Sequence, residues 1–274
     1  MSNRFVRWGV YLLIAIGFAV ACVFLSDWQF DRNESRASDI ALVEQNYDAA
    51  PVPLGELIDE DGELDAGDEW HPVILHGEYL AEEQVLVRNR PHGGTSAFEV
   101  LVPFRDADGR IFIVDRGWVP PGEGALPDAV PASPSGTVEV TVRLRTGEQL
   151  PSSGRSAPEG QVPTIHLPTV ADDLDGVVIV SAYGQIVEET PAPDTALGSF
   201  DSPTDDPGPH LSYAIQWILF GVMGFIFIFY MIRTEVQKHR EEAEGRPAPA
   251  KRSRRRDRDA DAEDELLDEV ETPV

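Results

Sequence analysis

The sequence predicts an α+β membrane protein in which two transmembrane helices flank a mostly antiparallel β domain, a small barrel or sandwich, outside the cytoplasm. Two uncharged apolar runs lie near the ends of the 274-residue chain, and each is long enough to enter or cross a bilayer. Between them, short runs rich in β-branched residues alternate with Gly, Pro and Asp clusters, which is typical of antiparallel strands. Basic residues occupy the flank of each apolar run that faces away from this β region.

The first apolar run covers residues 9–25 and the second covers residues 211–232. The second run has 22 residues without a charge, which gives about 33 Å of helix at 1.5 Å per residue. Residues 19–21 also resemble a signal-peptide cleavage site followed by Cys22. Cleavage there would leave an apolar start to the mature chain, so a transmembrane helix is the favoured interpretation, with Cys22 a small apolar residue within it.

Charge at the flanks of these runs predicts their orientation. The basic residues on the distal flanks are Arg4, Arg7, Arg233, Lys238 and Arg240. Because cytoplasmic flanks carry the excess of Lys and Arg, residues 1–8 and residues 233–274 are expected in the cytoplasm. The intervening segment is then extracytoplasmic. It contains 35 acidic residues and 10 arginines but no lysine.

Composition excludes several classes of function. The whole chain has 22 basic and 48 acidic residues and a net charge of −26, which argues against nucleic acid as a partner because phosphate recognition needs Lys and Arg. A single cysteine excludes an intramolecular disulfide, a CxxC redox pair, a thiolate zinc site and covalent c-type haem attachment.

The extracytoplasmic segment divides at Trp70. Residues 26–69 combine a polar stretch with helical character, residues 31–47, with an acidic Pro/Gly loop whose part from residue 59 to 69 is read as solvated. Residues 70–209 form the expected β domain. Its candidate strands are residues 71–75, 85–88, 98–104, 111–114, 138–144, 177–180 and 185–187.

Alternation within two of these runs predicts strands with one buried face. In residues 98–104 and in residues 138–144, apolar side chains occupy every second position. Asp108-Gly109 between two runs predicts a hairpin turn. Pro103 predicts an edge strand or a bulge, because proline cannot donate a ladder hydrogen bond. After residue 240 the chain is of low complexity, which is typical of a disordered charged tail.

We find no pattern of catalytic residues. HExxH, GxSxG, GxxxxGKS and GxGxxG are all absent. His71 and His76 are an odd number of residues apart in an expected strand, so they point to opposite faces and do not form a shared metal site. The chain is therefore expected not to be an enzyme.

His210 is the most suggestive single residue. It stands immediately before the second apolar run, where an imidazole is a candidate axial ligand for haem iron. Helical spacing places Tyr213, Trp217 and two glycines, Gly221 and Gly224, on the same side. The alternative is an ordinary interfacial belt of aromatic residues, which residues alone favour.

Three arginines, Arg88, Arg90 and Arg116, form a second group in an arginine-poor segment. Guanidinium groups bind carboxylates in a two-pronged manner, and haem propionates are carboxylates. The alternative, internal ion pairing with the abundant Asp and Glu, is favoured by composition.

Four ordered strings carry a family resemblance. They are SDWQFDR at residues 26–32, HGEYLAEEQVLVRNRP at residues 76–91, DGRIFIVDRGWVP at residues 108–120 and HLSYAIQW at residues 210–217. In sequence, order and placement they resemble the Surfeit locus protein 1 family, and the resemblance covers most of residues 8–235.

This resemblance implies a cytochrome c oxidase assembly factor that binds haem a at the outer leaflet and assists its insertion into oxidase subunit I, with a haem a synthase as a further candidate partner. It implies that His210 is the ligand to haem iron. A scaffold that stabilises oxidase assembly intermediates without touching haem is the alternative, and a sensor that signals to the tail is a third. The N-terminus lacks the Arg-rich, acid-poor pattern of a transit peptide, so a prokaryotic plasma membrane is expected.

Overall fold

The computed structural model describes residues 2–59, 62–124, 126–152, 154 and 156–243. The chain forms two compact units, one made of Met1–Phe30 with Pro209–Val274 and the other of Asp31–Gly208. The charged tail after residue 243 and residues 60–61 of the acidic loop lie outside the described residues.

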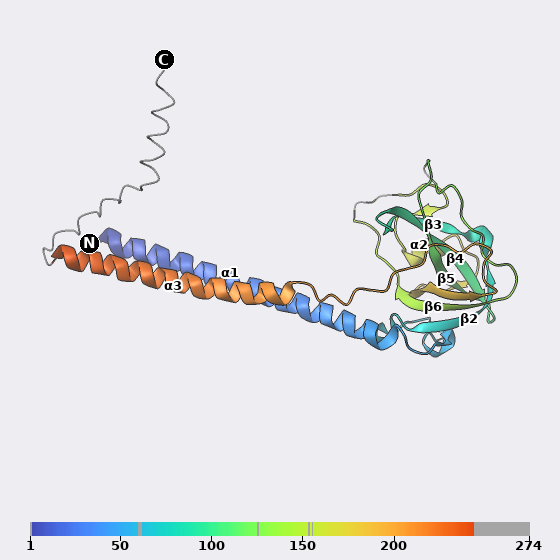
Figure 1. The fold of residues 1–274 in the computed structure, drawn as a ribbon, viewed down its shortest axis with the longest axis horizontal. Helices are drawn as coiled ribbons and strands as arrows, with labels where there is room; N and C mark the ends of the chain where they lie inside the picture. Colours follow the sequence, from blue (N-terminus) through green and yellow to red (C-terminus); the bar gives the residue numbers. More distant parts are fainter. Residues whose placement is uncertain (1, 60–61, 125, 153, 155, 244–274) are drawn as a thin grey trace, which may run out of the picture. The chain divides into compact units, whose positions relative to one another are not determined.

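Two long helices, α1 (Ser2–Asn46) and α3 (His210–Ala243), are each long and apolar enough to cross a membrane (Figure 1). The first apolar run and the polar stretch expected after it form one uninterrupted helix. No proline or glycine lies between residues 18 and 50, so no helix-breaking residue separates the apolar run from the polar stretch. At its end, the Asn46 amide donates to the carbonyls of Gly67 (2.7 Å) and Glu69 (2.9 Å).

The second unit is built on a mixed nine-stranded sheet with one short helix, α2 (Leu167–Ala171). The strands are β1 (Val52–Pro53), β2 (Pro72–Tyr79), β3 (Val85–His92), β4 (Thr95–Asp106), β5 (Arg110–Val119), β6 (Val138–Thr146), β7 (Gln161–Val162), β8 (Val177–Val178) and β9 (Ala182–Thr190). Single 3₁₀ turns occur at Leu54–Glu56, Ala66–Asp68 and Ala81–Glu83. All seven strands expected from the sequence are present, although most extend further than the apolar runs that predicted them.

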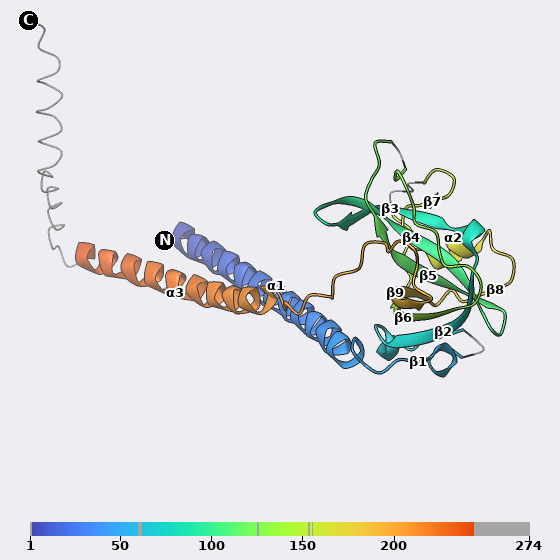
Figure 2. The ribbon, with the colours of Figure 1, turned by 45° about the vertical axis from the view of Figure 1, so that its right-hand side comes forward.

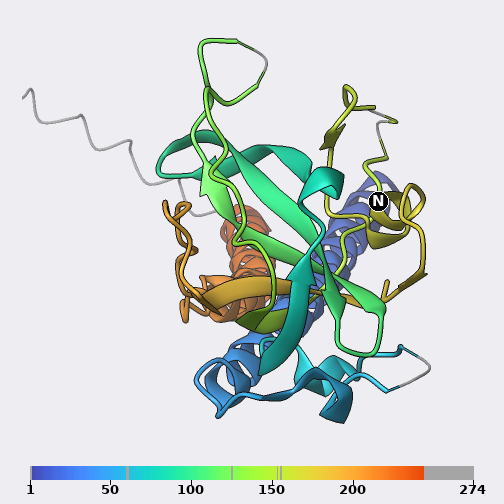
Figure 3. The same ribbon diagram turned by 90° about the vertical axis from the view of Figure 1, so that its right-hand side faces the viewer.

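The sheet has the order β1-β2-β6-β9-β5-β4-β3-β7, and its two halves face each other (Figures 2 and 3). Most long pairings are antiparallel, but β5 pairs with β9 in parallel and the short strands β1, β7 and β8 also pair in parallel. β2 also pairs with the end of β4. The pairing of β2 with β4 and that of β5 with β9 are both short, so the domain is sandwich-like rather than a regular closed barrel. A sandwich was one of the two architectures that the sequence predicted.

Two hydrophobic cores result. The larger lies between the two halves and contains the inward side chains of β2, β4, β5 and β6. The smaller lies on the other face of β3, β4 and β5, where Ile165 and the helix α2 cover Leu101 and Ile113. Leu54 and Ile58 also join the larger core, so the β domain begins before the expected boundary at Trp70.

Strand β4 therefore differs from its prediction. Its residues from Ala97 to Phe104 are all buried, so both faces are covered, whereas alternation predicted one buried face. The single buried face predicted for β6 is confirmed. Pro103 lies in an interior strand rather than at an edge. It stands where the partner of β4 changes from β3 to β2, so the missing amide proton of proline costs no hydrogen bond between strands there. The hairpin at Asp108-Gly109 is confirmed, with Gly109 at φ +81°.

Candidate functional site

The helices α1 and α3 run antiparallel and touch along a line of small residues. A Cβ placed on Gly221 would lie 3.6 Å from the Cβ of Cys22, and one placed on Gly224 would lie 3.1 Å from the ring of Phe18. Ala214 is completely buried. Small residues allow this close approach, which is how helices pack in lipid.

His210 is the first residue of α3 and lies at the end of this contact line. The carbonyl of Pro209 accepts the first helical hydrogen bond, from the amide of Tyr213 (3.0 Å). The Nδ1 atom of His210 lies 3.0 Å from Oε1 of Gln29 on α1. One turn along, the hydroxyl of Ser26 donates to the carbonyl of Ala214 (3.0 Å).

This contact bears on which nitrogen of His210 is available to a ligand. An amide oxygen only accepts hydrogen bonds, so this contact fits a neutral His210 ring that carries its proton on Nδ1. The lone pair is then on Nε2, which is the nitrogen that can bind a metal. Within the described residues, Nε2 has no hydrogen-bond partner.

The aromatic residues expected beside His210 flank the contact line. Tyr213 is 47% exposed, and Trp217 is half-buried with its ring edge-on to Phe220, at 5.7 Å between centroids. The side chain that follows His210 in the contact line is Ala214. The residues expected on one side of α3 therefore separate into two sets. His210, Gly221 and Gly224 lie in the contact with α1, whereas Tyr213 and Trp217 lie beside that contact.

Arg116 forms a buried ion pair within the β domain. Its side chain is fully buried, and its Nη2 and Nε lie 2.7 and 3.3 Å from the two carboxylate oxygens of Glu189. Glu189 also accepts from the hydroxyl of Tyr79 (2.8 Å), and the guanidinium lies 5.2 Å from the centre of the Tyr79 ring. Burial, followed by the nearby Glu189 carboxylate, raises the pKa of Tyr79 above its usual value. The carboxylate partner of Arg116 is therefore Glu189, a residue of the same domain.

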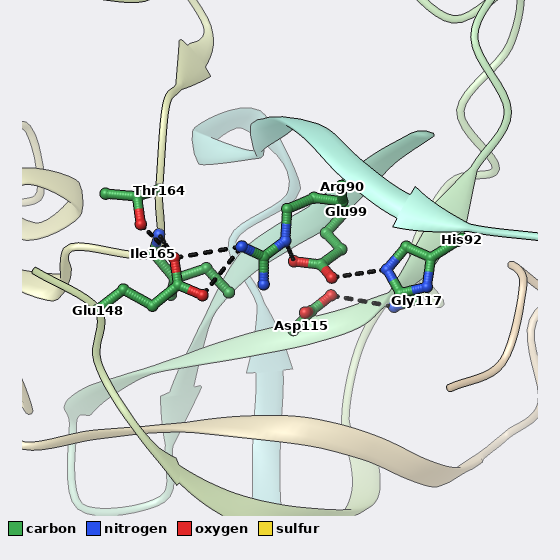
Figure 4. A network of polar contacts seen from close by, with 8 residues as sticks. All are labelled: Arg90, His92, Glu99, Asp115, Gly117, Glu148, Thr164 and Ile165. Carbon is green, nitrogen blue, oxygen red and sulfur yellow. Dashed lines mark hydrogen bonds and ion pairs between the residues drawn. The ribbon is translucent and has the colours of Figure 1, made fainter. Parts of the chain in front are cut away.

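Arg90 takes part in a second polar network, on the opposite side of the sheet (Figure 4). Its Nε lies 2.6 Å from Glu99, and its Nη1 lies 2.9 Å from Glu148. The Nε2 atom of His92 lies 2.7 Å from the other oxygen of Glu99. Glu148 in turn accepts from the hydroxyl of Thr164 and from a backbone amide. Arg90 thus joins β3 and β4 to the loop after β6.

Asp115 lies beside this network and is completely buried. One of its oxygens accepts from the amide of Gly117 (3.3 Å), while the other has no hydrogen-bond partner in the described part of the chain. Burial, followed by the neighbouring carboxylate of Glu99, raises the pKa of Asp115 well above its usual value. The carboxyl is therefore held towards its neutral form.

An aromatic stack closes the network at its His92 end. The imidazole of His92 is parallel to the indole of Trp118, at 5.4 Å between centroids, and Phe200 contacts His92 edge-on. The indole nitrogen of Trp118 donates to the carbonyl of Ser199 (2.9 Å). Gly117, at φ +122°, leaves room for the carbonyl of Gly198, which would lie 2.5 Å from any Cβ at that position.

The three arginines are not brought together. Arg90 and Arg116 are paired with carboxylates on opposite faces of the sheet. Arg88 is half-buried, and its Nε has no hydrogen-bond partner among the described residues. For Arg90 and Arg116 the structure shows the internal ion pairing that composition favoured. In the described residues, no group of three or more His, Cys, Asp or Glu side chains could hold a metal ion.

Sequence reasoning did not assign roles to Gln29, Glu99 or Asp115. Gln29 belongs to one of the strings that carry the family resemblance. The sequence held a clue to its contact: Gln29 follows the first apolar run and His210 precedes the second, so both are expected on the same side of the membrane. Glu99 had been expected on the exposed face of its strand. Its partners are Arg90 and His92 of the neighbouring strand, and Arg90 is held in turn by Glu148, about 50 positions after Glu99 in the chain.

Comparison with known proteins gives a consistent result. The chain matches the SURF1 family over residues 16–222. It is 36% identical over 236 residues to uncharacterized SURF1-like proteins of Mycobacterium bovis and Mycobacterium tuberculosis, covering 84% of this chain and 85% of theirs. It is also 29% identical over 121 residues to the cytochrome oxidase assembly protein SHY1 of Saccharomyces cerevisiae, covering 43% of this chain and 31% of that one. With fold, ordered strings and family match in agreement, this chain belongs to the SURF1 family.

Proposed function

We propose that this protein acts in the assembly of cytochrome c oxidase, by holding haem a through His210 and assisting its insertion into oxidase subunit I. Family membership and the yeast relative named as a cytochrome oxidase assembly protein support the assembly role. The observation that carries the haem proposal is the contact between His210 and Gln29. Nδ1 of His210 lies 3.0 Å from Oε1 of Gln29, and a proton on Nδ1 would leave the lone pair of Nε2 for a metal.

Haem a is cargo in this proposal. One axial nitrogen at the end of an apolar helix pair would supply reversible coordination, because a single bond to iron can be exchanged for a ligand in the acceptor protein. Tyr213 and Trp217 border the same region and offer flat apolar surfaces to a porphyrin. Arg90 and Arg116 are left out of this proposal, since their carboxylate partners lie within the chain.

The proposed location is a prokaryotic plasma membrane, with both termini in the cytoplasm and the β domain outside. The native cysteine, Cys22, is 2% exposed between the helices, so it gives little background in labelling experiments. A cysteine introduced at the exposed Ser135 should react with a membrane-impermeant maleimide on intact cells. Labelling only after cell lysis would contradict the orientation.

The haem proposal is tested by coexpressing the protein with haem a synthesis and recording the optical spectrum of the purified full chain, with pyridine haemochrome quantification. We expect haem a to copurify with the protein. His210→Ala should lose it while keeping its elution volume and circular dichroism. The matched control is His76→Ala, because His76 is an exposed histidine of the β domain.

Full haem binding by His210→Ala would remove His210 as the ligand. A colourless wild-type protein that copurifies with oxidase subunit I would support the scaffold without haem instead.

A further inference from the structure

We propose that Gln29 is a positioning residue for His210: it holds the imidazole as the Nδ1–H tautomer and thereby presents Nε2 to an incoming metal. The consequence for haem rests on the proposed function, whereas the tautomer itself is a property of the protein without haem. Gln29 would touch neither iron nor porphyrin and would act only through the ring.

The geometry ties the two residues to one another from different helices. Gln29 and His210 are both half-buried, and Oε1 lies 3.0 Å from Nδ1. Gln29 stands three residues after Ser26 on α1, and His210 stands four residues before Ala214 on α3, so each pair lies on one face of its helix.

The neighbouring contacts hold these faces together. Ser26 donates to the carbonyl of Ala214 at 3.0 Å, and Ala214 is completely buried. The position of Gln29 beside the imidazole is therefore set by helix packing as well as by its own hydrogen bond. Because side chains supported in this way keep their orientation, the ring of His210 is positioned before any ligand arrives.

The identity of the residue matters chemically. Glutamine is neutral, so it orders the ring without the strong increase in ligand basicity that a carboxylate partner produces. This suits cargo that must be released. One neutral hydrogen bond is expected to change the ratio of the two tautomers by about two- to tenfold.

The first test uses the full chain without haem. Histidine labelled with ¹⁵N is incorporated, and the spectrum of His210→Ala identifies the signals of His210 by difference. At a pH where the ring is neutral, wild-type His210 should show a protonated Nδ1 and an unprotonated Nε2. In Gln29→Leu the population should shift towards Nε2–H, whereas in Gln29→Glu, which keeps an acceptor, Nδ1–H should persist.

Ser26→Ala is the matched control. It removes a hydrogen bond of the same helix contact, one turn away, without touching His210. Because the buried packing around Ala214 remains and Gln29 keeps its own hydrogen bond, the tautomer ratio should stay close to that of the wild type, which separates a local effect from general loosening of the helices. A wild-type ring protonated on Nε2 would mean that Gln29 presents its NH₂ group and would overturn the proposal. So would a ratio that does not respond to Gln29→Leu.

The second test uses the haem-loaded chain. Gln29→Leu should weaken haem a retention about two- to tenfold, and Gln29→Glu should restore retention and lower the midpoint potential, because a carboxylate partner makes the ligand more electron-donating. The two proposals fail differently. A tautomer that responds to Gln29 in a protein that never binds haem would refute the haem function alone. Haem bound equally well by Gln29→Leu, with an unchanged tautomer, would refute the role of Gln29 alone.

Discussion

Replacing Arg116 by leucine should destabilise the β domain strongly. The guanidinium is fully buried and contacts both oxygens of Glu189, which is itself only 8% exposed. Removing one partner of a buried ion pair costs about 3–5 kcal/mol, because the remaining charge stays buried without compensation. Here the hydroxyl of Tyr79 still donates to Glu189, so we expect the lower end of that range.

The assay is thermal unfolding of the purified full chain, followed by tryptophan fluorescence. A domain of this size loses about 2–4 °C in Tm per kcal/mol, so Arg116→Leu should lower Tm by about 6–12 °C at a cost of about 3 kcal/mol. Arg105→Leu is the matched control, because Arg105 pairs with Glu78 at 3.3 Å on the surface, where both side chains are about half exposed. An exposed pair contributes about 0–1 kcal/mol.

A double-mutant cycle separates the pair from the single residues. When Arg116→Leu and Glu189→Leu are combined, the loss should be smaller than the two single losses added together, since no unpaired charge remains. Additive losses, or a drop in Tm no larger than that of Arg105→Leu, would show that the ion pair does not stabilise the domain.

Two further changes in the β domain have signs that follow from burial and space. Asp115→Asn should gain stability relative to the wild type as pH rises. Burial and the Glu99 carboxylate raise the pKa of Asp115 in the folded protein. The stability that the neutral carboxyl contributes is therefore present at low pH and is lost as pH increases through that raised pKa. Unfolding midpoints from pH 5 to pH 8 measure this, and a difference that stays constant or shrinks with pH would contradict it. Gly77→Ala should cost at least about 1–3 kcal/mol, because its Cβ would lie 1.9 Å from the carbonyl oxygen of Arg105. Gly55→Ala, where a Cβ meets nothing within 4 Å, is its control in the same melting experiment, and equal midpoints for the two variants would refute the argument.

The strands could be predicted because each one carries a local signal. Alternation in residues 138–144 comes from one covered face, and β6 has that pattern. The second covered face of β4 could not be predicted, because its cover comes from α2 and Ile165, more than 60 residues later in the chain. Glu99 shows the consequence of this second covered face. A carboxylate in an alternating strand predicts an exposed face, yet the side chain of Glu99 is only 4% exposed and is paired with Arg90 and His92.

The position of His210 could be predicted from the sequence, but its contact with Gln29 could not. The sequence places His210 directly before an uncharged run that could span a membrane. Its contact with Gln29, 181 residues away in sequence, requires knowledge of which faces of the two helices meet. Small residues on α3 mark that face, but neither hydropathy nor charge shows the rotation of α1 about its axis.

The four strings that carry the family resemblance separate into two groups by what their residues contact. The two inner strings contribute Gly77, Arg90 and Arg116, whose contacts are all within the β domain. The two outer strings contribute Gln29 and His210, which contact one another across the helix pair.

Loss of function can therefore arise in two distinguishable ways. Changes in the inner strings should lower the melting temperature of the domain, and any effect on oxidase assembly should follow the amount of folded protein. Changes at Gln29 or His210 should leave the melting temperature close to that of the wild type, because both residues are half-buried at the end of the helix contact. A His210→Ala protein that melts normally, accumulates normally and still fails in assembly would place the function at the helix pair, with the β domain supporting it structurally.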